Sequence, residues 1–343
     1  MERAAGNRGS RHFPILCSME QVTSEGPASP SFANRSVLVT GGAGFIGSHL
    51  VEALLNAGAT VAVIDDLTTG SLENLERVSS DIRFVQGSIL DPSALEEAVQ
   101  GAEILFHHAA LVSVVESIED PESYQRVNVE GTRAVLEAAR KHELTRVLFA
   151  GSCSAYGDLP GLPKHEVDPT APTSPYAATK VEAEELVASF AVEGGLDTAR
   201  LRYFNVYGPG QPADSPYAAV IPRFRQALIS GEEAVIYGDG EQTRDFVHVH
   251  DVVFANLLAA RHSEPLGGAV FNVGSGIRVS ILEVLNAVAA SLKVPVAVRH
   301  EPARPGEVRD SQASIELACS TFGYQPMRSL EESLAEFESA SRT

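Results

Sequence analysis

Tyr176 and Lys180 stand four residues apart in "SPYAATK" (174–180), a stretch that otherwise holds only small residues and one proline. In a helix this spacing places the phenol and the ammonium on one face, one turn apart. A phenol with a pKa of about 10 is a poor base near neutral pH, but a neighbouring ammonium favours the phenolate. Such a pair could accept a hydroxyl proton while a hydride leaves the same carbon.

A Tyr and a Lys at this spacing are common on solvated helices, so a third group is needed to indicate catalysis. "AGSCSAYG" (150–157) follows an apolar run and would place Ser152 and Cys153 at the carboxyl edge of a parallel sheet. There Ser152 can hydrogen-bond the oxygen of an alcohol or ketone. We therefore predict a catalytic trio of Ser152, Tyr176 and Lys180.

A glycine-rich turn, "TGGAGFIGSHL" (40–50), follows the first apolar run. Gly41, Gly44 and Gly47 recur every three residues, and the absence of Cβ atoms lets backbone amides approach a pyrophosphate at a helix N-terminus. Asp65 ends the next apolar run, where a carboxylate can hold ribose hydroxyls and repel a 2′-phosphate. The cofactor is therefore expected to be NAD and not NADP.

Short apolar runs alternate with helix-like stretches from residue 36 onward. The expected strands are 36–40, 60–65, 82–87, 103–109, 146–152 and 198–204, and the expected helices are 45–57, 92–100, 122–141 and 176–193. This alternation predicts an α/β fold: a Rossmann-like, doubly wound parallel sheet.

The chain changes character after "NVYGPGQP" (205–212), where Pro and Gly become frequent. We predict a flexible tail over 1–34, an NAD-binding Rossmann domain over 35–206 and a smaller mixed α/β lobe for substrate over 207–343. In that lobe we expect strands near 234–237 and 269–273 and helices near 217–230, 280–292 and 328–340.

Composition excludes several classes of protein. The formal net charge is −19 and no basic stripe is present, which argues against nucleic-acid binding. Cys17, Cys153 and Cys319 are odd in number and widely spaced, so we expect neither a disulfide framework nor a metal site. No apolar run is long enough for a membrane span, and we expect a cytoplasmic protein.

The motifs together resemble the extended short-chain dehydrogenase/reductases, specifically the nucleotide-sugar 4-epimerases of the UDP-galactose and UDP-N-acetylglucosamine type. The resemblance covers about residues 36 to 335. It rests on "TGGAGFIGSHL", "DDLTTG", "HHAALVSVVESIEDP", "NVEGT", "SPYAATK", "RYFNVYGPGQ", "YAAVIPRF", "YGDGEQTRDFVHV", "NVGSG" and "RPGEVRDSQA", in the family's order.

The resemblance implies site residues by position. The catalytic residues would be Ser152, Tyr176 and Lys180, with Lys180 also on the nicotinamide ribose. The NAD shell would be Gly41, Gly44, Phe45, Ile46, Gly47, Asp65, Asp66, Ser88, Ile89 and Ala109. The UDP-sugar would meet Cys153 (beside the sugar), Asn205, Arg244 and Arg304 (diphosphate), Ala219, Val220 and Tyr237 (uracil), Glu307 (ribose) and Ser311 (C2 of the sugar). Simpler roles stay open: Arg244 could pair with Asp245, and Tyr237 could belong to the core.

The sequence departs from the family pattern in three places. Ser88 replaces an Asp beside the adenine, which weakens or moves that contact. Gly151 replaces a common Ser, which we expect only to loosen the turn. Cys153 and Ser154 stand where dehydratases carry an acidic pair. A thiol at this position could act as an acid, but we favour a space-filling role.

These residues favour one reaction, the NAD-dependent 4-epimerisation of a UDP-hexose through a transient 4-keto sugar. Cys153 with Ser154 supplies no carboxyl pair for a 4,6-dehydratase. UDP-glucuronate 4-epimerases and decarboxylases usually carry an Arg soon after "YGP", whereas here the stretch is "GPGQPAD". A plain nucleotide-sugar oxidoreductase and a non-catalytic dinucleotide-binding regulator also remain open.

The resemblance also implies an assembly and a substrate range. Helices near 122–141 and 176–193 form a four-helix dimer interface in that family, and here they carry apolar positions beyond what the sheet requires, so we expect a homodimer. Ser311 stands where enzymes restricted to UDP-glucose and UDP-galactose usually carry Tyr. The small side chain leaves room for an N-acetyl group, which predicts activity on UDP-GlcNAc and UDP-GalNAc.

Overall fold

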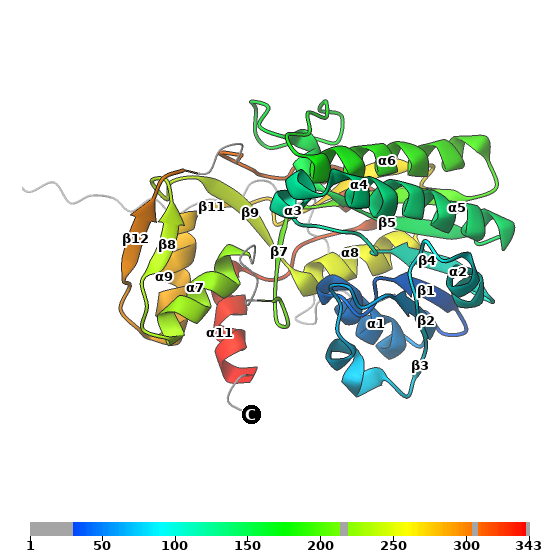
Figure 1. Ribbon diagram of the computed structural model, residues 1–343, viewed down its shortest axis with the longest axis horizontal. Helices are drawn as coiled ribbons and strands as arrows, with labels where there is room; N and C mark the ends of the chain where they lie inside the picture. Colours follow the sequence, from blue (N-terminus) through cyan, green and yellow to red (C-terminus); the bar gives the residue numbers. More distant parts are fainter. Residues whose placement is uncertain (1–29, 213–218, 304–307, 341–343) are drawn as a thin grey trace, which may run out of the picture.

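A seven-stranded parallel sheet forms the centre of the protein (Figure 1). The computed structural model describes residues 30–212, 219–303 and 308–340, without the side chains of 336–340. The strands are β1 (Ser36–Thr40), β2 (Thr60–Asp65), β3 (Ile82–Gln86), β4 (Ile104–His107), β5 (Arg146–Ser152), β6 (Asp197–Tyr203) and β10 (Ala269–Val273). Their order is β10-β6-β5-β4-β1-β2-β3. This is the doubly wound Rossmann-like sheet that the sequence predicts.

The chain reverses its direction of travel across the sheet between β1 and β4, because β1 pairs with both β2 and β4. In such sheets ligands bind beyond the carboxyl ends of the strands, at the point of reversal. The glycine-rich turn after β1 and the Ser152 end of β5 both lie on this carboxyl edge. The topology therefore brings together the two motifs that carry chemistry.

Helices cover both faces of the sheet. One face packs against α2 (Pro92–Val99), α5 (Gly131–Lys141) and α6 (Pro175–Glu193), and the opposite face packs against α1 (Phe45–Asn56), α8 (Val249–Arg261) and α10 (Glu316–Phe322). The helix expected over 122–141 is divided into α4 (Pro121–Tyr124), a π-helical turn (Gln125–Glu130) and α5. The short α3 (Val114–Glu119) precedes α4, and α5 and α6 lie side by side in Figure 1.

The second lobe, at the left of Figure 1, packs around its own core. Strand β8 (Ala234–Tyr237) pairs with β12 (Val298–Glu301), and β7 (Asn205–Tyr207), β9 (Thr243–His248) and β11 (Arg278–Ser280) form a three-stranded sheet. Helices α7 (Val220–Ile229), α9 (Ile281–Leu292) and α11 (Leu330–Ala340) cover them. A smaller mixed α/β lobe is therefore present, as predicted.

Two boundaries differ from the sequence prediction. The strand at 269–273, expected in the second lobe, is β10 and pairs with β6 in the large sheet. Helix α8 also packs on the large sheet, so the two lobes are not separated by a single cut in the chain. Phe32, predicted to lie in a flexible tail, is fully buried near the ring of Phe106. The folded chain therefore begins before residue 35.

Candidate active site

The glycine-rich turn after β1 is packed so closely that side chains would not fit. Gly41 has a φ of +68°, and a Cβ there would lie 2.7 Å from the backbone nitrogen of Ala109. A Cβ on Gly47 would lie 2.1 Å from the carbonyl oxygen of Gly41. These glycines let the start of α1 approach the end of β1, which leaves the helix N-terminus open to an anionic group.

Asp65 ends β2 beside this turn. Its carboxylate accepts hydrogen bonds of 2.9 Å from the backbone nitrogens of Ala43 and Leu67. Burial raises the pKa of Asp65, while these two bonds lower it. Asp66 is exposed and accepts a bond from the backbone nitrogen of Thr68. The carboxylate of Asp65 is thus fixed next to the glycine turn, where it fits a ribose diol.

The other predicted cofactor residues lie around the same edge. The backbone nitrogen of Ala109 donates 3.1 Å to Thr40 Oγ1 at the end of β1. Ile89 is buried, and Ser88 Oγ accepts from the backbone nitrogen of Leu90. Phe45 and Ile46 form the first turn of α1. Their contact with NAD remains a prediction.

Ser152, Tyr176 and Lys180 come together where β5 meets α6. Ser152 is the last residue of β5, and Tyr176 and Lys180 lie one turn apart near the start of α6, which begins after the N-cap Ser174. Ser152 Oγ accepts bonds from Ser154, at 3.2 Å from the backbone nitrogen and 2.8 Å from Oγ. Tyr176 is hydrogen-bonded to Ser152. The predicted trio therefore forms one cluster.

Burial moves the proton affinities of this pair in opposite directions. It raises the pKa of Tyr176 to about 12, against a smaller lowering by the bond with Ser152. It lowers the pKa of Lys180 to about 8, against a raising effect of the Glu184 carboxylate. The Lys180 ammonium lies 4.3 Å from the centre of the Phe149 ring. Both shifts favour the neutral forms, because a buried site penalises charge.

Asn128 fixes the helix turn that carries Tyr176, a role that sequence reasoning missed. Its Nδ2 donates 3.0 Å to Thr179 Oγ1, which in turn donates 2.8 Å to the Tyr176 carbonyl oxygen. Its Oδ1 accepts from the backbone nitrogen of Leu111. Asn128 is the first residue of "NVEGT", a motif that supported the family resemblance but was given no structural role. Asn128 thus links the backbone of Leu111 to the catalytic helix.

Gly151 does not loosen a turn, so that expectation is wrong. It lies within strand β5 and is buried. A Cβ there would lie 2.8 Å from Glu184 Oε1 and 3.1 Å from the carbonyl oxygen of Leu201. The missing side chain makes room for a buried carboxylate beside the catalytic cluster.

A cavity of about 460 Å³ opens in the second lobe. It is lined by Val112, Asn205, Val206, Tyr207, Gln211, Ala219, Val220, Ile221, Arg223, Phe224, Val235, Ile236, Tyr237, Gln242, Arg244, Phe246 and Ile281. Five predicted substrate residues are among them: Asn205, Ala219, Val220, Tyr237 and Arg244. Arg304 and Glu307 lie outside the described residues. Among the described lining residues the charged ones are Arg223 and Arg244, and sequence reasoning missed Arg223.

Cys153 lies next to the catalytic cluster and within the electrostatic reach of Arg244, which lines the cavity. It follows Ser152 in the chain, and the charge of Arg244 acts on its thiol. Burial raises the pKa of Cys153 to about 12. The side chain packs against Tyr156, Phe204 and Ala313. This apolar packing supports a space-filling role.

Ser311 lies behind the cavity wall. Its Oγ accepts a 3.4 Å bond from Asn205 Nδ2, and its backbone nitrogen donates to the Thr243 carbonyl oxygen. Ser311 is buried and is not among the described lining residues. Its predicted contact with C2 of a sugar remains untested, and its observed contact is with Asn205.

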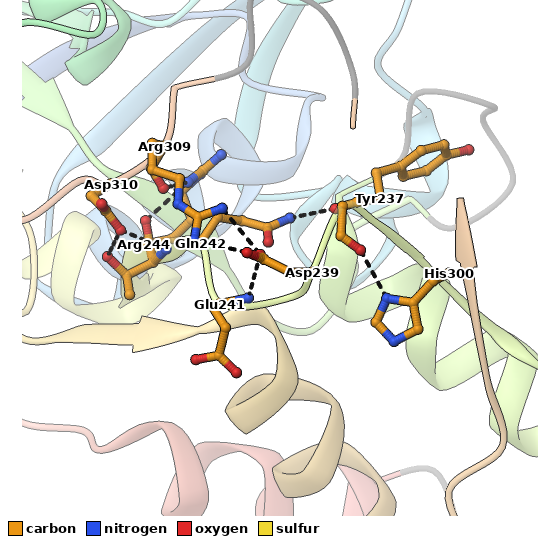
Figure 2. A network of polar contacts seen from close by, with 10 residues as sticks. Tyr237, Asp239, Glu241, Gln242, Arg244, His300, Arg309 and Asp310 are labelled. Carbon is orange, nitrogen blue, oxygen red and sulfur yellow. Dashed lines mark hydrogen bonds and ion pairs between the residues drawn. The ribbon is translucent and has the colours of Figure 1, made fainter. Parts of the chain in front are cut away.

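A polar network fastens the segment after residue 307 over this lobe (Figure 2). Arg309 pairs with both carboxylate oxygens of Asp239 at 3.0 Å. Asp310 accepts from the backbone nitrogen and Oγ1 of Thr243. Arg244 Nη1 donates to the carbonyl oxygens of Thr243 and Arg309. The network fixes the Arg244 guanidinium at the cavity.

Asp245, the neighbour of Arg244 in the chain, accepts hydrogen bonds from two other segments of the second lobe. Its carboxylate accepts bonds from the backbone nitrogens of Ala313, Ser275 and Gly276 and from Ser275 Oγ. Burial raises its pKa to about 6. Asp245 thus ties the 275–276 loop and the 311–314 segment to β9 from inside the lobe.

Within 30–212, 219–303 and 308–340, no group of three or more His, Cys, Asp or Glu side chains is arranged to hold a metal ion. In that same part of the chain, no helix is both long and apolar enough to cross a membrane.

The family model described as "NAD dependent epimerase/dehydratase family" matches residues 37–274. A UDP-glucose 4-epimerase of Mycolicibacterium smegmatis is 39% identical over 302 residues, which cover 87% of this chain and 96% of the relative. A UDP-N-acetyl-alpha-D-glucosaminuronate decarboxylase of Bacillus cytotoxicus is 39% identical over 257 residues, covering 73% and 78%.

Solved structures are similar over most of the chain. The UDP-N-acetylglucosamine 4-epimerase of Methanobrevibacter ruminantium, in complex with UDP-N-acetylmuramic acid, has a TM-score of 0.84 at 36% identity and covers 90% of this chain and 99% of its own. The UDP-glucose 4-epimerase of Thermus thermophilus, in complex with NAD, has a TM-score of 0.80 at 36% identity, covering 88% and 96%.

Proposed function

Because this chain belongs to the NAD-dependent epimerase/dehydratase family, we propose that it is a UDP-hexose 4-epimerase. The substrates would be UDP-GlcNAc and UDP-GalNAc, UDP-Glc and UDP-Gal, or both pairs. The observation that carries the proposal is the Ser152–Tyr176–Lys180 cluster at the sheet edge, beside a cavity whose described charged lining is Arg223 and Arg244.

The residues present fit NAD, the cofactor of this family. The close packing at Gly41 and Gly47 keeps the α1 N-terminus free for a pyrophosphate, and Asp65 is fixed at the ribose position. NAD, when bound, would accept a hydride from the sugar and return it. The acidic residue at the end of β2 favours NAD over NADP, because a 2′-phosphate would meet a carboxylate.

The chain's own groups would move the proton. Tyr176 would accept the proton of the sugar 4-hydroxyl, because a charged Lys180 nearby favours the phenolate. Ser152 would donate a hydrogen bond to the same oxygen as it becomes a ketone. Arg244 and Asn205 would hold the diphosphate, which leaves the 4-keto sugar free to turn its other face before Tyr176 returns the proton.

Dehydration is not favoured at this site. A 4,6-dehydratase needs an acid and a base near C5 and C6, whereas this chain carries Cys153 and Ser154 at the sequence positions where dehydratases carry that pair. The thiol has a pKa raised to about 12 by burial, so it is a poor proton donor near neutral pH. The residues beside Ser152 thus support a reaction confined to C4.

A second candidate is a reaction on a UDP-sugar acid, either 4-epimerisation or decarboxylation. The observation that favours it is Arg223, a second cation in the cavity lining that could meet a carboxylate. Arg223 also lies 5.7 Å from the centre of the Tyr237 ring, so it could instead form one wall of a nucleobase slot.

The two candidates are separated by their products. The purified protein, without added NAD, is incubated with UDP-Glc, UDP-Gal, UDP-GlcNAc, UDP-GalNAc and UDP-glucuronic acid, and products are resolved by proton NMR. We expect C4 epimers of the neutral sugars and no free NADH. Conversion of UDP-glucuronic acid alone, or accumulation of a keto sugar with NADH, would contradict the proposal.

Tyr176→Phe is the matched control, because it removes one hydroxyl. We expect turnover to fall by roughly 10² to 10⁴, with NAD binding and thermal unfolding unchanged. Turnover near the wild-type rate would remove Tyr176 from the mechanism.

We also propose a homodimer through α5 and α6. The expected surplus of apolar side chains is absent from α5, whose exposed residues are Arg133, Glu137, Arg140 and Lys141; on α6 the exposed large apolar residue is Val192. A partner would therefore meet a largely charged face. Light scattering at micromolar concentration should show a dimer at low salt; a monomer there would contradict the proposal. The cytoplasmic location also stays a prediction.

A further inference from the structure

A buried ion pair lies next to the catalytic cluster. Arg202, in β6, contacts Glu184, in α6, through Nε at 3.1 Å to both carboxylate oxygens and through Nη2 at 2.7 Å to Oε2. The exposed side-chain fractions are 5% for Arg202 and 2% for Glu184. The proposed reaction does not use this pair, and burying two charges needs a reason beyond stability.

The position of Glu184 follows the spacing of the catalytic residues. Tyr176, Lys180 and Glu184 recur every four residues along α6 and so share one helix face. The carboxylate fills the space that Gly151 leaves open on β5, where a Cβ would come within 2.8 Å of Oε1. The absence of a side chain at Gly151 thus leaves space for the Glu184 carboxylate, one helical turn beyond Lys180.

Lys180 needs such a partner to remain charged. Burial lowers its pKa to about 8, and the Glu184 carboxylate is the group that raises it. From the end of β4, His107 and His108 also face Lys180, but burial lowers both of their pKa values to about 3, so they are neutral near pH 7. On its own helix, Tyr176 is neutral as well, with a pKa of about 12.

The other elements packed around Lys180 and Glu184 contribute few charged groups. Beside Glu184, strand β6 contributes Arg202 and Arg200, whose Nη1 donates 3.5 Å to the Glu184 carbonyl oxygen. Strand β5 contributes the Phe149 ring under the ammonium. From α4, Tyr124 lies edge-on to the Tyr176 ring and is a neutral phenol whose pKa burial raises further.

We propose that Glu184 is a positioning residue of the active site: paired with Arg202, it holds the Lys180 ammonium charged and in place beside Tyr176 at neutral pH. Arg202 holds the Glu184 carboxylate through three charge-assisted bonds. Arg202 is itself held by the Tyr156 ring, 4.6 Å from its guanidinium, and the Tyr156 hydroxyl donates 2.7 Å to Asn272 Oδ1.

This inference deepens the proposed function and rests on it for the activity measurement only. A direct readout is available because the chain contains four lysines, at 141, 164, 180 and 293. The protein is labelled with ¹³C at lysine Cε, and each signal is followed by NMR from pH 6 upward. The signal that Lys180→Met removes is assigned to Lys180.

In Glu184→Gln we expect the Lys180 titration midpoint to fall by about one pH unit or more. Glu184→Asp, which retains the carboxylate, should stay closer to the wild type. Should Glu184→Gln not fold, the double variant Glu184→Gln, Arg202→Gln also removes the Arg202 charge that would otherwise be left without its partner, and it should still show a lower midpoint. An unmoved midpoint in the variant that folds would overturn the inference.

The matched control is Asp197→Asn. The Arg146–Asp197 pair joins β5 and β6, with a distance of 2.6 Å, and is also largely buried, but it lies at the opposite ends of these strands from Gly151 and Arg202. This variant should lose stability without moving the Lys180 midpoint. A shift equal to that of Glu184→Gln would show a general effect of lost buried charge and would also overturn the inference.

The activity measurement separates the two proposals. If the wild type is an epimerase, the alkaline limb of its pH–rate profile should move to lower pH in Glu184→Gln by the same amount as the NMR midpoint. If the wild type shows no epimerisation, the proposed function fails while the NMR result still decides the role of Glu184. A rate loss without movement of the limb would mean a merely structural role.

Discussion

A Lys180→Met variant should be more stable to urea than the wild type near neutral pH, although it removes a catalytic cation. Burial lowers the pKa of Lys180 from its ordinary 10.5 to about 8. A fall of this size means that the charged side chain costs the folded state about 3 kcal/mol below pH 8. Methionine has a similar length and packs well against an aromatic ring such as that of Phe149.

The sign of the pH dependence follows from which state holds the proton. The unfolded chain keeps the Lys180 proton up to about pH 10.5, whereas the folded chain releases it near pH 8. Between these values the unfolded state binds more protons, so wild-type stability rises with pH across this window. The advantage of Lys180→Met should therefore be largest below pH 8 and vanish above pH 10.5.

The assay is urea unfolding followed by circular dichroism at several pH values, with Lys141→Met as the control. Lys141 is exposed and pairs with Glu96 at the surface, so this change should leave the stability nearly unchanged. Loss of the Phe149 contact reduces the expected gain to about 1–3 kcal/mol. A variant less stable than the wild type at neutral pH, or equally more stable at every pH, would refute the reasoning.

Three other changes test the cofactor turn and the substrate lobe. Gly47→Ala places a Cβ 2.1 Å from the Gly41 carbonyl oxygen, so we expect a loss of about 1–3 kcal/mol in stability and weaker NAD binding by fluorescence titration. Ser311→Tyr should lower kcat/KM for N-acetylated UDP-sugars more than for UDP-Glc; equal loss on both would reject the C2 assignment. Arg309→Gln breaks an exposed pair with Asp239, so the midpoint of unfolding should stay nearly unchanged while KM for the UDP-sugar rises.

The parts of the site that the sequence predicts are those set by local spacing. Tyr176 and Lys180 are joined by one helical turn, and Gly41, Gly44 and Gly47 by one strand-to-helix turn. The geometry within each motif is fixed by its own helix or turn, and the two motifs lie close together because both follow strands that end at the carboxyl edge of the parallel sheet. The strands of the large sheet were predictable for the same reason, because each is an apolar run bounded by turn residues.

What the sequence does not predict are the contacts between distant segments. Glu184 meets Arg202 across 18 residues and meets Gly151 across 33, and none of these residue types alone indicates a buried pair. Strand β9 runs directly into α8 with no Gly or Pro between them, which hides both elements from a search for turn signals. In the sequence, Arg223 has the features of an ordinary solvated helix residue, and only the folded structure shows that it lines the cavity.

Burial favours the neutral form of both Tyr176 and Lys180. It makes a proton harder to remove from Tyr176 and easier to remove from Lys180, so the site without added charge favours neutral groups. A base that must form a phenolate then depends on positive charge brought next to it. Lys180 supplies this charge only while Glu184 opposes the effect of burial, and the positive nicotinamide of bound NAD would add to it. The burial that disfavours the charged form of Lys180 thus makes proton transfer depend also on the positive charge of the cofactor. This dependence suits an enzyme that must not react before NAD is bound.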